Sequence, residues 1–318
     1  MNDTRQPSYH TLDAADGDGT SPSPEVTSAP LGQDRWAWSS KLGLSVVAMP
    51  SDSIALNQIV MLYREIFGND PAWQEGAYCA AEGWKARVSL AEYERRAAGG
   101  SACCPRCGAT LLPCHSDEKL LCRMRELAAS PEGYGLVLLD REHRPRGFSW
   151  GLTGTLAQST EALVRTRYGG REAEGRRDVE RLMKVVGERG TTATDRILYG
   201  EEIAIGKSSR SFEATMLLAE AIFSQGIRRN VGRMWFWTSP RSGIYPFARC
   251  VGFQPVMEVA DGVEYLALDD LAFAARMLRE MPPARFAIYC ARALRALGIR
   301  PNHNHSPGPS ASAAQTEE

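Results

Sequence analysis

Residues 197–227 read ILYGEEIAIGKSSRSFEATMLLAEAIFSQGI and place an apolar run, a polar turn and an amphipathic segment in immediate succession. The first part, Ile197–Ile205, is rich in residues that favour a strand. From Phe212 to Ile227, apolar residues recur at spacings of three and four, which predicts a helix with one buried face. The turn GKSSRS between them supplies two cations and three hydroxyl groups directly before the helix begins.

The same criteria predict the elements on either side of this unit. Further strands are predicted at Leu44–Met49, Gly135–Leu139, Gly147–Leu152, Met234–Thr238, Pro255–Val259 and Glu264–Leu268. Helices are predicted at Ser51–Gly68, Asp117–Ala129, Ser159–Arg189 with a break at Gly169–Gly170, Pro246–Cys250, and Asp270–Leu297 with an interruption at Pro282–Pro283. A further helical pattern lies within Gly76–Gly100 and includes AEYERRAAGG. Hairpins mixed with helices indicate an α/β (α+β) fold with a mostly antiparallel central sheet flanked by helices.

Composition limits the classes of partner. The chain has 318 residues, and 37 Lys+Arg against 38 Asp+Glu leave a formal net charge of −1. This balance gives no long-range attraction to nucleic acid or to an anionic membrane. No apolar run approaches the roughly 20 residues of a membrane span, and the N-terminus lacks the basic and apolar regions of a secretion signal. These features predict a cytoplasmic protein.

Shifts in composition predict the domain limits. Residues 1–34 and 301–318 are rich in small and polar residues and are predicted to be disordered tails. Between them we expect a main domain over 35–269, interrupted by an insert at about 100–123, and a helical extension over 270–300.

The order of these elements resembles the GNAT superfamily of N-acetyltransferases over roughly Leu44–Asp269. FARCVGFQPV, residues 247–256, is similar to the passage in that family where Gly-Phe follows a short helix. In the family, one strand splays away from its neighbour and presents backbone groups to the pantetheine arm of acetyl-CoA. The turn after it and the following helix N-terminus hold the pyrophosphate, as free N–H groups and the helix dipole favour.

The resemblance assigns acetyl-CoA to the 197–227 unit. It implies cofactor contacts from Ile203, Ile205, Lys207, Ser208, Ser209, Arg210, Ser211 and Ala214. The family's turn reads Gln/Arg-x-x-Gly-x-Gly/Ala, and this chain has Ser209, Phe212 and Ala214 at the three defined positions. Only Ala214 matches, and Phe212 stands where the family has its middle glycine.

Transfer of an acetyl group to an amine needs a base, because the amine is protonated at neutral pH. Glu201 and Glu202 lie in the predicted strand and are expected to point to opposite faces, so that one of them reaches the substrate. The leaving thiolate needs a proton. Many members of the family have a tyrosine that acts as the general acid, and its position is Ala248 here. Tyr245, about one helical turn earlier, is the expected substitute.

The cysteines indicate a metal site. Of 8 cysteines, five lie between Cys103 and Cys122, and thiols in the cytosol stay reduced. Cys104-Pro-Arg-Cys107-Gly has the form of a zinc knuckle. The predicted ligands of a structural Zn²⁺ are Cys104, Cys107, Cys114 and Cys122, with Cys79, Cys103 and His115 as alternatives. A redox dithiol and a loop of unrelated thiols are the other interpretations.

Two functions follow. The first is an N-acyltransferase that moves an acetyl group from acetyl-CoA to a primary amine of a small molecule or protein. The second is a non-catalytic GNAT-like scaffold whose zinc ribbon binds a protein partner. Nucleic-acid binding is disfavoured, because the insert has only scattered basic residues. The insert is expected to be structural and is distant in sequence from the expected cofactor turn. A part in the acceptor surface or in a protein contact is the alternative.

Overall fold

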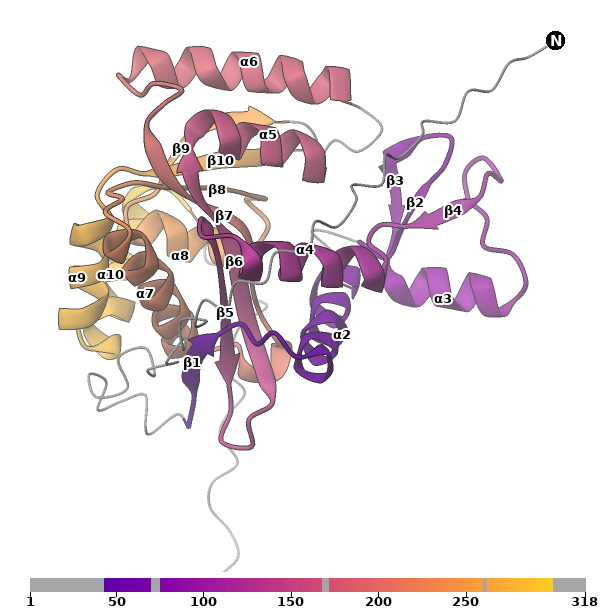
Figure 1. Ribbon diagram of the computed structural model, residues 1–318, viewed down its shortest axis with the longest axis horizontal. Coiled ribbons are helices and arrows are strands. Elements are labelled where there is room, and N and C mark those ends of the chain that lie inside the picture. The colour runs from indigo at the N-terminus through magenta and orange to yellow at the C-terminus, as the bar shows by residue number, and fades with distance from the viewer. Residues whose placement is uncertain (1–42, 70–74, 168–171, 260–261, 300–318) are drawn as a thin grey trace, which may run out of the picture.

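The computed structural model describes residues 43–69, 75–167, 172–259 and 262–299 (Figure 1). The predicted tails, 1–34 and 301–318, lie outside these ranges. The strands of the central sheet are β1 (Ser45–Ala48), β5 (Gly133–Leu139), β6 (Pro145–Thr155), β7 (Arg196–Ile205), β8 (Met234–Thr238), β9 (Gln254–Val259) and β10 (Val263–Leu268). The helices are α2 (Ser53–Asn69), α3 (Leu90–Ala98), α4 (Asp117–Ala129), α5 (Leu156–Arg167), α6 (Glu172–Glu188), α7 (Phe212–Arg228), α8 (Ile244–Cys250), α9 (Leu271–Glu280) and α10 (Pro283–Ala296).

The central sheet has seven strands in the order β1-β5-β6-β7-β8-β10-β9. Its neighbouring strands are antiparallel, except that β7 and β8 run parallel. Helices cover both faces (Figure 1). The expected fold class, a mixed and mostly antiparallel sheet flanked by helices, is therefore confirmed.

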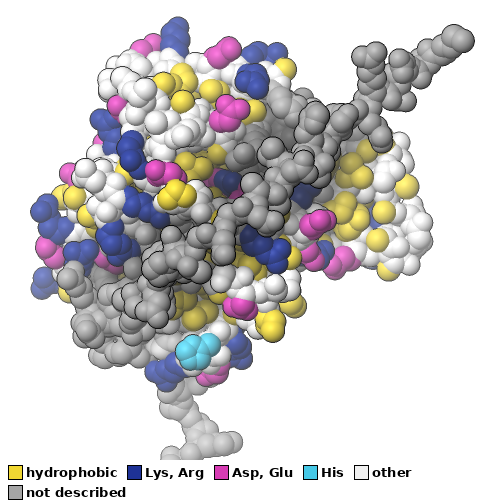
Figure 2. All heavy atoms as spheres, viewed as in Figure 1, with side chains coloured by type: hydrophobic (Ala, Val, Ile, Leu, Met, Phe, Trp, Pro, Cys, Tyr) yellow, Lys and Arg dark blue, Asp and Glu magenta, His cyan; other side chains and the backbone are white. Residues whose placement is uncertain are grey.

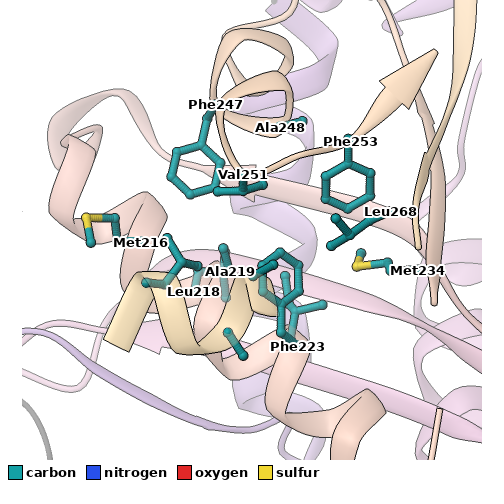
Figure 3. Packing of buried hydrophobic residues seen from close by; sticks show 14 of the residues in the cluster. Met216, Leu218, Ala219, Phe223, Met234, Phe247, Ala248, Val251, Phe253 and Leu268 are labelled. Carbon is teal, nitrogen blue, oxygen red and sulfur yellow. The ribbon is translucent and has the colours of Figure 1, made fainter. Parts of the chain in front are cut away.

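Each face of the sheet has its own hydrophobic core. Helices α7, α8, α9 and α10 pack on one face, and α2, α4, α5 and α6 pack on the other. Figure 3 shows part of the first core, where α7 residues that include Met216 and Phe223 face Phe247 of α8 and Val251, which follows α8. In the predicted stripe of α7, Met216, Ala219 and Phe223 are buried, Phe212 is half-buried and Ile227 is exposed.

A second, small sheet forms a separate lobe, drawn at the right of Figure 1. It consists of β2 (Ala77–Cys79), β3 (Gly83–Val88) and β4 (Leu111–Pro113), in the order β3-β2-β4. The helical pattern predicted within Gly76–Gly100 is confirmed by α3, which contains AEYERRAA. The residues before it form β2 and β3, which the sequence did not predict, and residues 77–79 pair with the distant 111–113. The lobe thus begins well before the expected insert at about 100–123.

Charged side chains of both signs share the described surface. Figure 2 shows Lys and Arg side chains interspersed with Asp and Glu over the described part of one face. Within residues 43–69, 75–167, 172–259 and 262–299, no helix combines the length and apolar character needed to cross a bilayer.

The C-terminal extension completes the first core, and its contribution is testable. The Phe286 side chain of α10 is fully buried, 5.3 Å between ring centroids from Phe212 and 6.0 Å from Phe247. Phe286→Ala should lower the free energy of unfolding by about 3–5 kcal/mol, because it removes apolar contacts and leaves a cavity. Urea unfolding measures the loss.

The control is Ile288→Ala, on the same helix, where the side chain is 55% exposed. It should change stability by less than about 0.5 kcal/mol. Equal effects of the two substitutions would contradict the packing of α10 on α7 and α8.

Candidate functional site

Strand β7 contains a bulge at Glu201. Across the β6–β7 pair, Glu202 lies opposite Trp150 and Gly200 lies opposite Gly151, so Glu201 is the extra residue. Such an insertion bends a strand and increases its twist. The parallel pairing of β7 with β8 ends at the same place, at Gly200. After the bulge, β7 continues to pair with β6 but no longer pairs with β8.

The bulge places both carboxylates on one face of the sheet. Arg123 of α4 donates from Nε to Glu201 Oε2 at 3.0 Å, and its second nitrogen contacts the other oxygen. Tyr63 of α2 lies 3.5 Å from Glu202 Oε1. Because α2 and α4 cover the same face, the expectation that Glu201 and Glu202 point to opposite faces is wrong. Tyr199 and Ala204 also both pack in the core on this face. They are five residues apart, so the regular alternation of side chains along a strand would place them on opposite faces.

A hydrogen-bond network leads away from Glu202. The Tyr63 hydroxyl donates to Glu75 at 2.9 Å, and Glu75 Oε2 lies 3.5 Å from His115 Nε2. The Tyr63 ring stacks on Trp150, with 5.7 Å between centroids. Burial, and then the carboxylates of Glu202 and Glu75, raise the pKa of Tyr63 well above its usual value. Tyr63 therefore stays protonated and serves as a donor between two carboxylates.

Sequence reasoning missed two members of this network. Tyr63 falls on the buried stripe of a predicted helix and has the pattern of a core residue, while Glu75 lies in a short segment without a motif. His115 was considered only as a metal ligand. These residues come from three separate segments, so no local pattern could have joined them.

The residues of the expected cofactor turn, 207–214, form hydrogen bonds with one another and with the rest of the protein. Lys207–Ser209 form a short 3₁₀ helix, and Ser211 caps α7 by accepting from the Ala214 N–H at 3.0 Å. Arg210 Nε donates to the Ile205 carbonyl at 3.0 Å. Ser208 accepts from Arg146 at 3.4 Å. Ser208, Arg210, Ser211 and Ala214 thus each have a structural partner, whereas the Lys207 side chain is exposed.

Phe212, at the family's glycine position, anchors α10. Its ring lies against Phe247 of α8 and Phe286 of α10. The first residue of α7 therefore faces protein side chains contributed by the C-terminal extension.

Tyr245 lies at the carboxyl end of β8. Its hydroxyl donates to Glu264 Oε2 at 2.7 Å, and Glu264 is paired with Thr238, the last residue of β8. Burial, and then the Glu264 carboxylate, raise the pKa of Tyr245 to about 12. Tyr245 belongs to the core on the α7–α10 face of the sheet, whereas Glu201 and Glu202 meet α4 and α2 on the other face.

The cysteine cluster differs from the predicted ligand set. Within the described ranges, Cys79, Cys104 and Cys107 form one group whose sulfur atoms lie within 4.8 Å of one another. Cys114 and Cys122 lie outside it. Cys122 is on α4, which packs on the central sheet, and donates to Glu126 at 3.5 Å. Cys114 follows the far end of β4, and its N–H donates to the Gly76 carbonyl. Cys79, an alternative in the sequence, takes their place because β2 pairs with β4.

Comparison with known proteins finds likeness in solved structures alone. No family model matches the chain, and no curated protein matches it. The PaiA N-acetyltransferase from Thermoplasma acidophilum, solved with coenzyme A, is 10% identical, with 71% of this chain and 98% of that chain covered and a TM-score of 0.39. A spermidine N-acetyltransferase from Vibrio cholerae, solved with CoA and spermine, is 10% identical, with 73% of this chain and 98% of that chain covered and a TM-score of 0.39. An agmatine N-acetyltransferase mutant is 12% identical, with 71% of this chain and 99% of that chain covered and a TM-score of 0.43.

The Arg123–Glu201 pair provides a test of the site's architecture. The Glu201 side chain is 5% exposed, so Arg123→Ala leaves a buried carboxylate without its ion-pair partner. We expect a loss of about 3 kcal/mol in unfolding free energy, measured by urea denaturation.

Two further variants complete this test. Adding Glu201→Gln should recover part of the loss, because it removes the unpaired charge. Arg125→Ala, on the exposed side of the same helix, should have little effect. Strictly additive losses in the double variant would contradict the pairing.

Proposed function

We propose that the protein is an N-acyltransferase that moves the acetyl group of acetyl-CoA to a primary amine of a small molecule or protein. One observation carries the proposal. At Glu201 a bulge ends the pairing of β7 with β8 and places two carboxylates beside the strand segment Ile203–Ile205. A strand end without a β8 partner offers backbone groups to an extended ligand arm, as the GNAT resemblance implies.

Glu202 is the proposed base. Glu201 is held by Arg123, which makes it a positioning residue rather than a proton acceptor. Glu202 contacts the Tyr63 hydroxyl, and Tyr63 contacts Glu75, which lies beside the 25% exposed side chain of His115. A proton taken from the ammonium group could leave Glu202 along this chain of groups toward solvent.

The bond changes in the transfer are simple. The deprotonated nitrogen attacks the thioester carbonyl carbon, a C–N bond forms and the C–S bond breaks, and the nitrogen releases a second proton to solvent as the amide forms. The sulfur leaves with the electron pair and is protonated as CoA. Tyr245 is the proposed donor to this sulfur. Because its pKa is raised to about 12, above the roughly 8.5 of a thiol, Tyr245 would exchange its hydrogen bond to Glu264 for one to the developing thiolate, and solvent would supply the proton.

The diphosphate is assigned to the turn between β7 and α7, as the resemblance implies. The first-turn N–H groups of α7 and the exposed Lys207 provide positive potential there. Ile203 and Ile205 would contact the pantetheine arm through backbone groups. Ser208, Ser209, Arg210, Ser211 and Ala214 shape the turn, and their own hydrogen bonds support it in a fixed form.

The packing of Phe212 favours the second candidate, a non-catalytic scaffold. Its ring fills the position of the family's glycine and lies against α10, where the family needs close approach of the diphosphate. A scaffold of this kind would act through protein contacts, with the small lobe as the contact surface.

Binding of acetyl-CoA separates the two candidates. At about 100 times the dissociation constant, acetyl-CoA should stabilise the protein by about 3 kcal/mol, seen as a rise in melting temperature. Lys207→Glu should reduce the shift, because it places a negative charge at the diphosphate.

The matched control for this experiment is Lys184→Glu, which makes the same charge change at an exposed position of α6. It should bind like the wild type. No shift in the wild type at any concentration would overturn the acyltransferase proposal and leave the scaffold.

Glu202→Gln tests the base. The rate of CoA release with a panel of amines (polyamines, arylalkylamines, amino acids and peptides) should fall by about 10²- to 10⁴-fold, with the acetyl-CoA melting shift unchanged. Glu258→Gln, at an exposed position of β9, serves as the control. An unaltered rate in Glu202→Gln would remove Glu202 from the mechanism.

A further inference from the structure

The small lobe contains two turns of the same form. Cys79-Ala-Ala-Glu82-Gly83 joins β2 to β3, and Cys104-Pro-Arg-Cys107-Gly108 precedes β4. Each turn has a cysteine, two intervening residues, a residue able to bind metal and a glycine. In the first turn the Glu82 N–H donates to Cys79 Sγ at 3.4 Å. In the second, Gly108 adopts a φ of 74°, which favours glycine.

The two turns bring three sulfur atoms to one point. The Cys79 and Cys107 sulfur atoms are 3.4 Å apart, and all three sulfur atoms of the group lie within 4.8 Å of one another. A tetrahedral zinc ion with Zn–S bonds of about 2.3 Å separates its sulfur ligands by about 3.8 Å. The spacing of Cys79, Cys104 and Cys107 therefore suits zinc with only small adjustments.

The repeated form of the turns points to Glu82 as a fourth ligand, although its carboxylate is not among the atoms that lie within 4.8 Å of one another. Glu82 occupies in the first turn the position that Cys107 occupies in the second. Its carboxylate lies 3.8 Å from Arg106, a residue of the second turn, so the side chain already reaches across to that turn. Cys103, directly before Cys104, is the other candidate for the fourth ligand. It forms a β-bridge with Thr110, and because successive side chains in extended backbone point to opposite sides, it is expected to point away from the side of Cys104.

The lobe also needs a stabilising element of this kind. Its hydrophobic core consists of five buried residues, two of which are cysteines of the group: Ala77, Cys79, Ala86, Cys104 and Leu111. A core this small stabilises a three-stranded sheet weakly, and a bound metal ion commonly supplies the remainder.

We propose that a zinc ion binds the thiolates of Cys79, Cys104 and Cys107 and the carboxylate of Glu82. The ion connects the β2–β3 turn to the loop before β4 and holds the three-stranded sheet in register. Three thiolates and one carboxylate leave the site with two net negative charges, and Arg106 is placed to offset part of them.

Metal analysis tests the thiolate ligands. The full-length protein, purified under reducing conditions without added chelator, should hold one zinc ion per chain. Cys79→Ser and Cys107→Ser should each lose most of it, and Cys122→Ser, a cysteine outside the group, should retain it. Absence of zinc from the wild type together with a disulfide between Cys79 and Cys107 would overturn the proposal, as would loss of zinc in Cys122→Ser.

Glu82 needs its own test. Apo-protein is titrated with Zn²⁺ against a competing chelator, and circular dichroism checks that each variant keeps its helices. Glu82→Ala should weaken zinc binding by roughly tenfold or more, and Glu82→Cys should restore or strengthen it. With Co²⁺ as the probe, Glu82→Cys should increase the sulfur-to-cobalt charge-transfer absorption by about one third, since a fourth thiolate joins three. Equal zinc affinities of Glu82→Ala and the wild type would overturn the assignment of Glu82.

Discussion

The extra residue at Glu201 sets the geometry on which the rest of the site depends. A bulge at this point ends the parallel pairing at Gly200 and turns the remainder of β7 away from β8. It also shifts the alternation of side chains, so that both carboxylates meet the helices of one face. The same local defect in the ladder thus creates the divergence of the strands and places acid–base groups beside it. Glu201 shares the face of Tyr199, as a regular alternation requires, whereas Glu202 reaches Tyr63 only because of the bulge.

The small lobe connects the cysteine group to the carboxylate network. Ala77 pairs with Pro113 in the three-stranded sheet, and the Cys114 N–H donates to the Gly76 carbonyl. Glu75, which precedes β2, and His115, which follows β4, therefore lie at one end of the sheet, and Cys79 lies at the other end. The register of β2 against β4 determines where Glu75 and His115 stand, so the lobe contributes side chains to the network that begins at Glu202.

The C-terminal extension shapes the opposite face. Through Phe286, α10 covers Phe212 at the start of α7 and joins it to α8. The ring of Phe212 thus belongs to the packing of α10 and not to an open turn. The hydroxyl and guanidinium groups between β7 and α7 also bond to the protein itself. The cofactor turn that we propose would therefore use residues that already support the fold, which is why binding of acetyl-CoA is the decisive measurement.

Local sequence determined those elements whose pattern is complete within one segment. The limits of α4 and β8 agree with the prediction, and those of α7 agree within a residue, because caps, periodicity and β-branched runs act between near neighbours. The Cys104-Cys107 turn is local for the same reason. Only the tertiary structure decided the bulge, the face that Glu201 shares with Glu202, the network of Tyr63, Glu75 and His115, and the choice of Cys79 over Cys114 and Cys122. Each of these depends on strand register or on contacts between distant segments, and the free energy of such pairings is absent from any single stretch of the chain.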